Sequence, residues 1–290
     1  MIDIKLRKNR LLEREDLFIL EYNKYKDIFI TRFKWNNLPF GMTSRIIEEQ
    51  LFENGKLLFF KDKKMGLGYL VLPVQPFDSV NVYGEATRYN VYGKSYNDQL
   101  TIDDGVLIKN TYTMTPPNIY VTNYVNRIVD LDLAIEVNIN ATKQPIIAEG
   151  DEKSLLSLKN MYNQIIGNEL VIFKNKLKDV GEGLTVHNTN VIYYAKDYYD
   201  MKKNYENELL TYLGIDNSNI DKKERNLVDE VNANNEIIND NLYKMLKTRQ
   251  EACEEINKMF GLNISVELAN DVEPVTAVNE ESEEGESDGK

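Results

Sequence analysis

Residues that could carry out chemistry are scarce in this chain. Its only histidine is His187 and its only cysteine is Cys253, so neither a Cys/His zinc site nor a disulfide framework can form. No serine lies in a G-x-S-x-G sequence, and no G-x-x-x-x-G-K-[ST] phosphate loop occurs. Carboxylate neighbours such as Asp103 and Asp104 are typical of a solvated surface in so acidic a protein. We therefore predict no catalytic residue, no metal site and no cofactor, and we expect Cys253 to be a buried structural thiol.

Two clusters of basic residues stand out against this background. The first lies in a polar stretch, residues 215–234, and a connection of this length is usually functional or disordered. It consists of Lys222, Lys223 and Arg225. The second, in the N-terminal arm, consists of Lys5, Arg7, Lys8 and Arg10. The arm is suited to contact nucleic acid or an acidic protein, and the first cluster would form a circle of cations if the chain assembled as a ring.

Acidic residues give the chain of 290 residues a formal net charge of −12, which taken alone argues against a nucleic-acid partner. Residues 269–290 hold eight carboxylates against Lys290 alone, so they contribute −7 and the rest of the chain −5. After Val278 no apolar residue occurs, and we expect this segment to be a disordered acidic tail. Residues 57–74, the most apolar stretch, are interrupted by charges at 61–64, so we expect neither a transmembrane helix nor a membrane partner. The N-terminus also lacks the apolar core of a signal peptide.

Hydrophobic periodicity predicts an α+β protein of one large or two small domains. Aromatic residues recur at helical spacing from Phe18 to Phe33 and indicate a long first helix. Helices are expected at residues 11–37, 43–52, 118–140, 152–166, 196–213 and 239–260. An antiparallel β unit is expected from short runs at residues 57–61, 67–72, 79–83, 87–92 and 105–109. Strands at 145–148 and 170–173 would form a β-α-β insert with the helix between them, and a last strand is expected at 264–268.

Two stretches resemble a known family. Residues 210–232, LTYLGIDNSNIDKKERNLVDEVN, and residues 247–267, KTRQEACEEINKMFGLNISVE, carry the resemblance, and weaker similarity extends it over most of residues 35–268. They resemble the portal proteins, also called upper collar or head–tail connector proteins, of small short-tailed phages of the picovirus type. The resemblance implies a portal fold with long tilted channel-lining helices, a small α/β clip domain and a mixed helix and β wing, assembled as a ring.

The predicted organisation follows from this resemblance. It comprises a basic arm (1–10), a wing (11–115), a stem helix (116–143), a clip domain (144–195), a second stem helix (196–216), a channel loop (217–234), a wing helix and strand (235–268) and an acidic tail (269–290). Lys222 and Lys223 match the loop lysines of the family, and Arg225 lies beside them. The other two channel lysine positions fall on Asn188 and Asp197, so the full set of lysine rings is not expected here.

The function that the resemblance implies is structural. Twelve subunits would form a ring at one capsid vertex, conduct double-stranded DNA during packaging and ejection, and dock the tail. The expected partners are further copies of the chain, the DNA, the major capsid protein, lower collar or tail proteins and, transiently, a packaging ATPase. The expected location is the head–tail junction of the virion, after assembly in the host cytoplasm. Two alternatives stay open, namely another ring-forming tail or collar protein and a carboxylate-dependent hydrolase.

Overall fold

The computed structural model describes residues 14–142, 146–150, 171–175, 185–186, 192–217 and 228–269. The chain divides into two compact units, which are treated separately below. Unit 1 comprises Met1–Asn126 with Glu206–Lys290, and unit 2 comprises Arg127–Tyr205. The predicted helix at 152–166, both basic clusters, His187 and the acidic tail beyond residue 269 lie outside the described residues.

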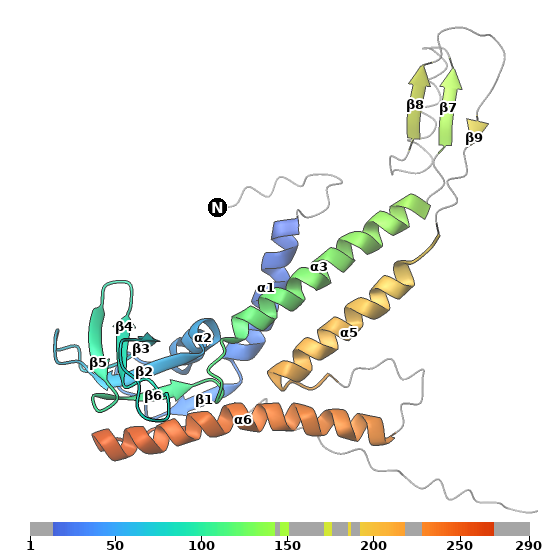
Figure 1. The fold of residues 1–290 in the computed structure, drawn as a ribbon. Coiled ribbons are helices and arrows are strands. Elements are labelled where there is room, and N and C mark those ends of the chain that lie inside the picture. The colour runs from blue at the N-terminus through green and yellow to red at the C-terminus, as the bar shows by residue number, and fades with distance from the viewer. Residues whose placement is uncertain are drawn as a thin grey trace, which may run out of the picture. The chain divides into compact units, whose positions relative to one another are not determined.

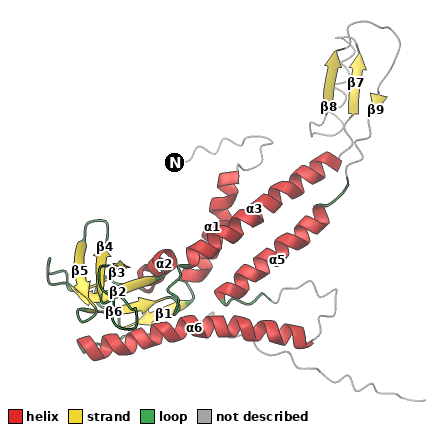
Figure 2. Cartoon of the chain, viewed as in Figure 1, coloured by secondary structure: helices red, strands yellow, loops and turns green. Residues whose placement is uncertain are grey.

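Unit 1 contains an antiparallel sheet of five strands in the order β5-β4-β3-β2-β6 (Figures 1 and 2). Its strands are β2 (Lys56–Lys61), β3 (Tyr69–Pro76), β4 (Arg88–Tyr92), β5 (Asn97–Thr101) and β6 (Gly105–Lys109). Leu57 to Phe60 of β2 are all buried, because β2 lies between two other strands and Leu58 and Phe60 pack in a cluster with side chains of β3 and β4. The predicted antiparallel β unit is therefore confirmed.

Helices pack on this sheet and on each other within unit 1. They are α1 (Arg14–Ile30), α2 (Ser44–Asn54) and α6 (Val228–Phe260), and a second sheet pairs β1 (Phe33–Asn36) with β10 (Ser265–Leu268). α2 begins where the Thr43 side chain accepts the N–H of Ile46, and it ends at Gly55. Phe260, at the end of α6, packs its ring against Phe59 and Tyr69 of the larger sheet.

The sequence predictions for residues 31–37 and for residues 79–83 were wrong. The first helix ends at Ile30, and Phe33 and Trp35 lie in β1, where alternate residues are buried against β10. The helical spacing from Phe29 to Phe33 is thus coincidental, because Phe33 is buried by a strand pairing. Residues 79–83 form a turn between β3 and β4 instead of a strand, since the Asn81 side chain closes the turn through backbone hydrogen bonds.

Two long helices run through both units. They are α3 (Pro117–Thr142) and α5 (Ala195–Leu213), both close to their predicted bounds, with Pro117 at the favoured first helical position. Within unit 1, the rings of Tyr120 and Tyr212 stack at 3.9 Å between centroids. Within unit 2, Lys202 Nζ of α5 lies 2.7 Å from Asp132 Oδ1 of α3. The two helices are therefore antiparallel neighbours within each unit.

Unit 2 also contains the small sheet β8-β7-β9. Its strands are β7 (Ile146–Gly150), β8 (Val171–Asn175) and β9 (Thr185–Val186). β7 and β8 are parallel, as expected of the two strands of a β-α-β insert. Together, the long helices, the antiparallel sheet and this small parallel pair confirm the predicted α+β class.

Candidate functional site: the helix junction beside the basic segment

The predicted basic cluster is flanked by two described helices. Lys222, Lys223 and Arg225 belong to residues 218–227, which lie outside the described part of the chain. α5 ends at Leu213 before this segment, and α6 begins at Val228 after it. The structure therefore describes how the two ends of the segment are held. The described part of the chain begins at Arg14, so the structure does not describe the residues of the basic arm, Lys5, Arg7, Lys8 and Arg10.

α6 begins earlier than the sequence predicted. The periodicity indicated a start near residue 239, whereas the helix extends from Val228. Its buried positions include Asn235, Ile238, Leu242 and Met245, which lie three or four residues apart. The asparagine at the first of these positions interrupts the apolar pattern, so the first turns were interpreted as loop.

The C-terminus of α5 is closed by a Schellman motif. The N–H of Ile215 donates to the carbonyl of Leu210 at 2.9 Å, and the N–H of Gly214 donates to that of Thr211 at 3.0 Å. Gly214 has φ 66°, a left-handed conformation that favours glycine. A Cβ at this position would lie 2.7 Å from the backbone nitrogen of Leu242 in α6. The close approach of the two helices therefore requires glycine at 214.

Asparagine side chains join the two ends of the segment. Asn217 Nδ2 donates to the carbonyl of Asn207 at 2.9 Å and to Thr211 Oγ1 at 2.7 Å. Asn234, on α6, donates through Nδ2 to Asn217 Oδ1 at 2.7 Å. Asn241 Nδ2 donates to the carbonyl of Thr211 at 2.9 Å. We call these five residues the asparagine junction; it fixes the chain before the basic segment to the chain after it.

Arg32 links this junction to the start of β1. Its guanidinium donates to the carbonyls of Leu213 and Gly214, at 2.9 Å for the second, and its own carbonyl accepts the N–H of Ala269 at 2.9 Å. The side chain is buried, and burial, followed by the nearby charge of Arg249, lowers the pKa of Arg32 to about 9. The residue is thus still cationic at neutral pH, where a positive charge stabilises the C-terminus of α5.

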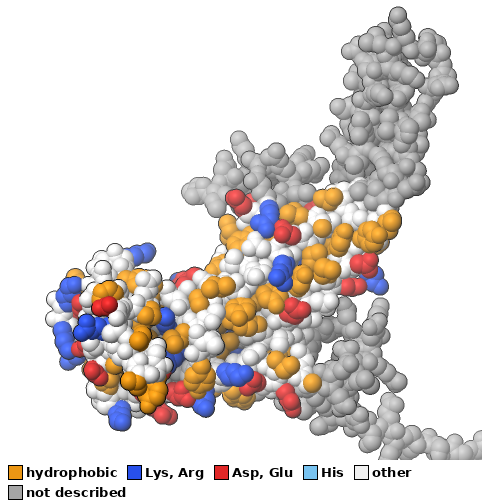
Figure 3. All heavy atoms as spheres, in the orientation of Figure 1, with side chains coloured by type: hydrophobic (Ala, Val, Ile, Leu, Met, Phe, Trp, Pro, Cys, Tyr) orange, Lys and Arg blue, Asp and Glu red, His pale blue; other side chains and the backbone are white. Residues whose placement is uncertain are grey.

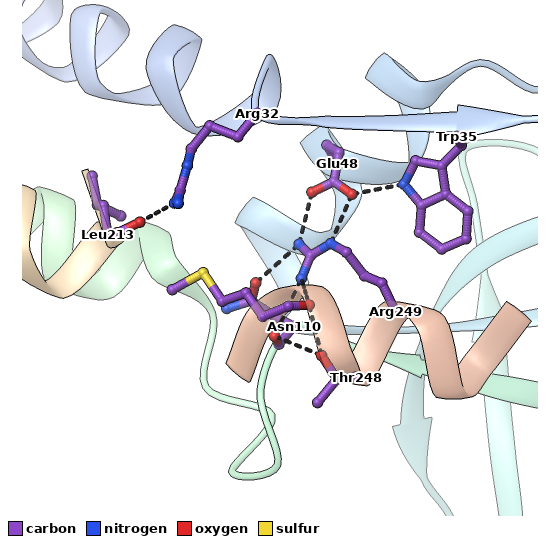
Figure 4. Close-up of polar contacts among 8 residues, drawn as sticks. Arg32, Trp35, Glu48, Asn110, Leu213, Thr248 and Arg249 are labelled. Carbon is purple, nitrogen blue, oxygen red and sulfur yellow. Dashed lines mark hydrogen bonds and ion pairs between the residues drawn. The ribbon is translucent and has the colours of Figure 1, made fainter. Parts of the chain in front are cut away.

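A buried ion pair fixes α6 to the sheets of unit 1 (Figure 4). Arg249 Nη2 lies 2.7 Å from Glu48 Oε2, and its Nε lies 2.9 Å from Glu48 Oε1; both side chains are fully buried. Trp35 Nε1 donates to the same carboxylate at 2.8 Å, and Asn110 Oδ1 accepts from Arg249 Nη2 at 3.1 Å. This pair therefore joins α6 to α2, to β1 and to the residue after β6.

Sequence reasoning missed this pair. Arg249 lies among buried apolar positions of α6, since Met245, Ala252 and Ile256 share its face. A single arginine on the apolar stripe of an amphipathic helix indicates a buried ion pair, and this signal could have been noticed. The partner of Arg249 could not have been identified from the sequence, because Glu48 lies far away along the chain and several other glutamates resemble it.

No group of three or more His, Cys, Asp or Glu side chains in the described ranges could hold a metal ion, and no helix there is long and apolar enough to cross a membrane. What the junction does is mechanical: it holds the ends of the basic segment against a rigid core. Sequence comparison shows to which family of proteins this chain with its asparagine junction belongs. The sequence matches the Phage Connector (GP10) family over residues 2–273.

The chain belongs to the phage connector family. A phage connector is a structural component at the junction of head and tail, so the protein is a head–tail connector of the portal type and a part of the virion. The predicted family is thereby confirmed.

Three solved structures are similar to this chain at low sequence identity. A chain of the portal and tail of native bacteriophage P68 is 17% identical, with a TM-score of 0.47, and the match covers 90% of this chain and 88% of that chain. A chain of the virion of a native gene transfer agent particle is 10% identical, with a TM-score of 0.48 and coverage of 90% and 85%. An HK97 family phage portal protein from Corynebacterium diphtheriae is 12% identical, with a TM-score of 0.46 and coverage of 89% and 94%.

Proposed function

We propose that twelve copies of this connector, the number that the family resemblance implies, form a ring at one capsid vertex. Double-stranded DNA would pass through the ring during packaging and ejection. The observation that carries the proposal is the layer of two helices in unit 2. Among the described residues of that unit, the buried apolar side chains are Ile128, Val129 and Ala195.

Apolar side chains on this helix pair face solvent instead (Figure 3). Val137 of α3 is 65% exposed, and Ile192 and Tyr193, just before α5, are 62% and 60% exposed. Further exposed apolar residues of unit 2 are Ile139, Tyr194, Tyr199 and Met201. An apolar surface of this extent is typical of a protein interface. In a ring, the same helix pair of each neighbouring copy would cover it.

We infer that the basic segment faces the bore of this ring. A conduit must not hold DNA tightly, because each phosphate contact adds affinity and hence friction. The acidic balance of the chain outside its tail, −5, suits a wall that repels DNA and keeps it centred. Lys222, Lys223 and Arg225 would contact phosphates briefly without reading bases, and would act as a valve against backsliding.

The remaining partners follow from this location. We propose that the connector contacts the major capsid protein, lower collar or tail proteins and, transiently, the packaging ATPase, with the basic arm Lys5, Arg7, Lys8 and Arg10 as a contact for the motor or nucleic acid. It would assemble in the host cytoplasm, catalyse no reaction and need no cofactor.

Two measurements test the proposal. Native mass spectrometry and electron microscopy of the purified chain should give a closed ring with a central bore wide enough for a duplex; a monomer at assembly concentrations would refute the ring. Replacing Lys222 and Lys223 by Gln should leave ring assembly unchanged and lower the retention of packaged DNA in particles. The matched control replaces Lys247 and Lys258, two exposed lysines of α6, by Gln. Equal retention in the two variants would refute the role of the segment.

A further inference from the structure

β3 carries an exposed loop at each of its ends. Residues 62–68, here called the basic loop, precede it, and residues 77–87, here called the acidic tip, follow it. A strand of eight residues separates the two by about 26 Å, at ~3.3 Å per residue. Both loops expose apolar side chains, most strongly Val82 and Tyr83 at 93% and 86%, and also Met65 and Leu67.

The basic loop is held in one conformation by Asp62. This buried carboxylate accepts the backbone N–H of Lys64 at 2.9 Å, of Met65 at 3.1 Å and of Leu67 at 2.9 Å. It also accepts the hydroxyl of Tyr96 at 2.9 Å. Three backbone bonds to one side chain fix the loop, so its exposed side chains are presented from a rigid turn.

The acidic tip is equally well fixed. Asn81 Oδ1 accepts the N–H of Tyr83 and the N–H of Glu85, both at 2.9 Å, and the N–H of Asn81 donates to the carbonyl of Glu85 at 2.8 Å. Gly84 has φ 80°, which lets the chain turn at this point. The turn thus holds Val82 and Tyr83 away from the rest of the chain, where they make almost no contact with it.

The two loops carry opposite charges. The basic loop exposes Lys63 and Lys64, next to the exposed Lys61 at the end of β2, whereas its one carboxylate, Asp62, is buried. Lys63 Nζ also lies 3.0 Å from Asp104 Oδ1 of the same chain. The acidic tip exposes Asp78 and Glu85 and contains no lysine or arginine. On the lobe formed by the five-stranded sheet, basic and apolar side chains lie close together (Figure 3).

We propose that the acidic tip of one copy docks on the basic loop of the next copy around the ring. Complementary patches at two different places of one subunit form a head-to-tail contact, which generates a closed ring when the rotation closes. Val82 and Tyr83 would pack on Met65 and Leu67, with lysines and carboxylates around them. Because both loops are fixed beforehand, docking loses little conformational entropy. The inference rests on the proposed ring and specifies one of its contacts.

A double cysteine variant of the full chain, Val82→Cys with Met65→Cys, tests this contact. The native Cys253 is buried, and burial raises the pKa of its thiol to about 12, so it will not compete. Under mild oxidation, the variant should give a ladder of covalent multimers on a non-reducing gel. A disulfide needs Cα atoms within about 7 Å, so the ladder would report the two loops of different copies in contact.

Each single cysteine variant is the matched control and should give no ladder beyond a dimer. A second variant, Val82→Ser with Tyr83→Ser, should raise the concentration needed for ring assembly about tenfold and leave the melting temperature of the monomer unchanged. If native mass spectrometry detects the ring of the double cysteine variant but oxidation gives no ladder, this contact is wrong while the ring stands. If the unmodified chain forms no ring, the proposed function fails instead.

Discussion

Asn234 donates a hydrogen bond of 2.7 Å to Asn217, and the basic cluster lies among the sixteen residues, 218–233, between them. The same Asn217 side chain donates to the end of α5, so a single amide connects the outgoing and the returning chain. A loop whose ends are tied loses less entropy when it binds than one whose ends move independently. The asparagine junction therefore prepares the basic segment for whatever it contacts.

Replacing Asn234 by Ala should loosen these ends. The substitution removes one partly buried hydrogen bond and leaves Asn217 Oδ1 without its donor, at a cost of about 1 kcal/mol in the free energy of unfolding. Tryptic cleavage after Lys222, Lys223 and Arg225 should become faster, as followed by mass spectrometry. Glu236→Ala, an exposed change on the same helix, is the control. Equal cleavage rates in both variants would mean that the junction does not restrain the segment.

Two glycines allow a matched test of helix packing. Gly214 and Gly261 have nearly the same φ, 66° and 67°, but a Cβ would meet α6 backbone atoms only at 214 and has open space at 261. Gly261→Ala should therefore lose only the conformational cost, about 1 kcal/mol. Gly214→Ala should cost a further ~2 kcal/mol because α5 must move away from α6. Thermal or urea unfolding measures both, and equal losses would contradict the close approach.

Breaking the buried ion pair should destabilise unit 1 strongly. Arg249→Met leaves the buried carboxylate of Glu48 without its cation, which costs about 3–5 kcal/mol. Adding Glu48→Gln removes the uncompensated charge and keeps an acceptor for Trp35, so the double variant should be more stable than Arg249→Met alone. Chemical denaturation of the native chain, Arg249→Met and the double variant measures these differences. A double variant less stable than this single one would show that charge burial is not the dominant cost.

The basic loop should open in acid. The N–H of Leu67, followed by those of Lys64 and Met65 and the hydroxyl of Tyr96, lowers the pKa of Asp62 to about 2. Because this pKa is lower in the folded chain than the ordinary value near 4, the carboxylate stabilises the fold above that value. This contribution is lost as the pH falls from about 4 to 2. The difference in stability between the native chain and Asp62→Asn should therefore shrink over that range; a constant difference would contradict the assignment.

Local signals in the sequence predicted the ends of helices well. Pro117, Gly55 and Gly214 act through their own backbone preferences, so a single sequence suffices to find them. β1 was missed because its partner β10 is more than 200 residues away and Phe33 continues the aromatic spacing of α1. Strand pairing at such a distance leaves no trace in a local window.

In the candidate site too, the sequence shows some of the residues, whereas others are recognised only from the fold. The cluster of Lys222, Lys223 and Arg225 is visible in the sequence because charge is a property of the residues themselves. The asparagine junction is not visible in the sequence, because asparagines alone indicate a turn as readily as a side-chain hydrogen bond between helices. Arg32 was also missed, since only the fold brings it to the end of α5.

The hydrogen bond from Ala269 to Arg32 joins the last described residue of the chain to the start of β1. The Arg32 side chain also donates to the carbonyls at the end of α5, just before the basic segment. A force on the chain at Ala269 would therefore act through Arg32 on the end of α5.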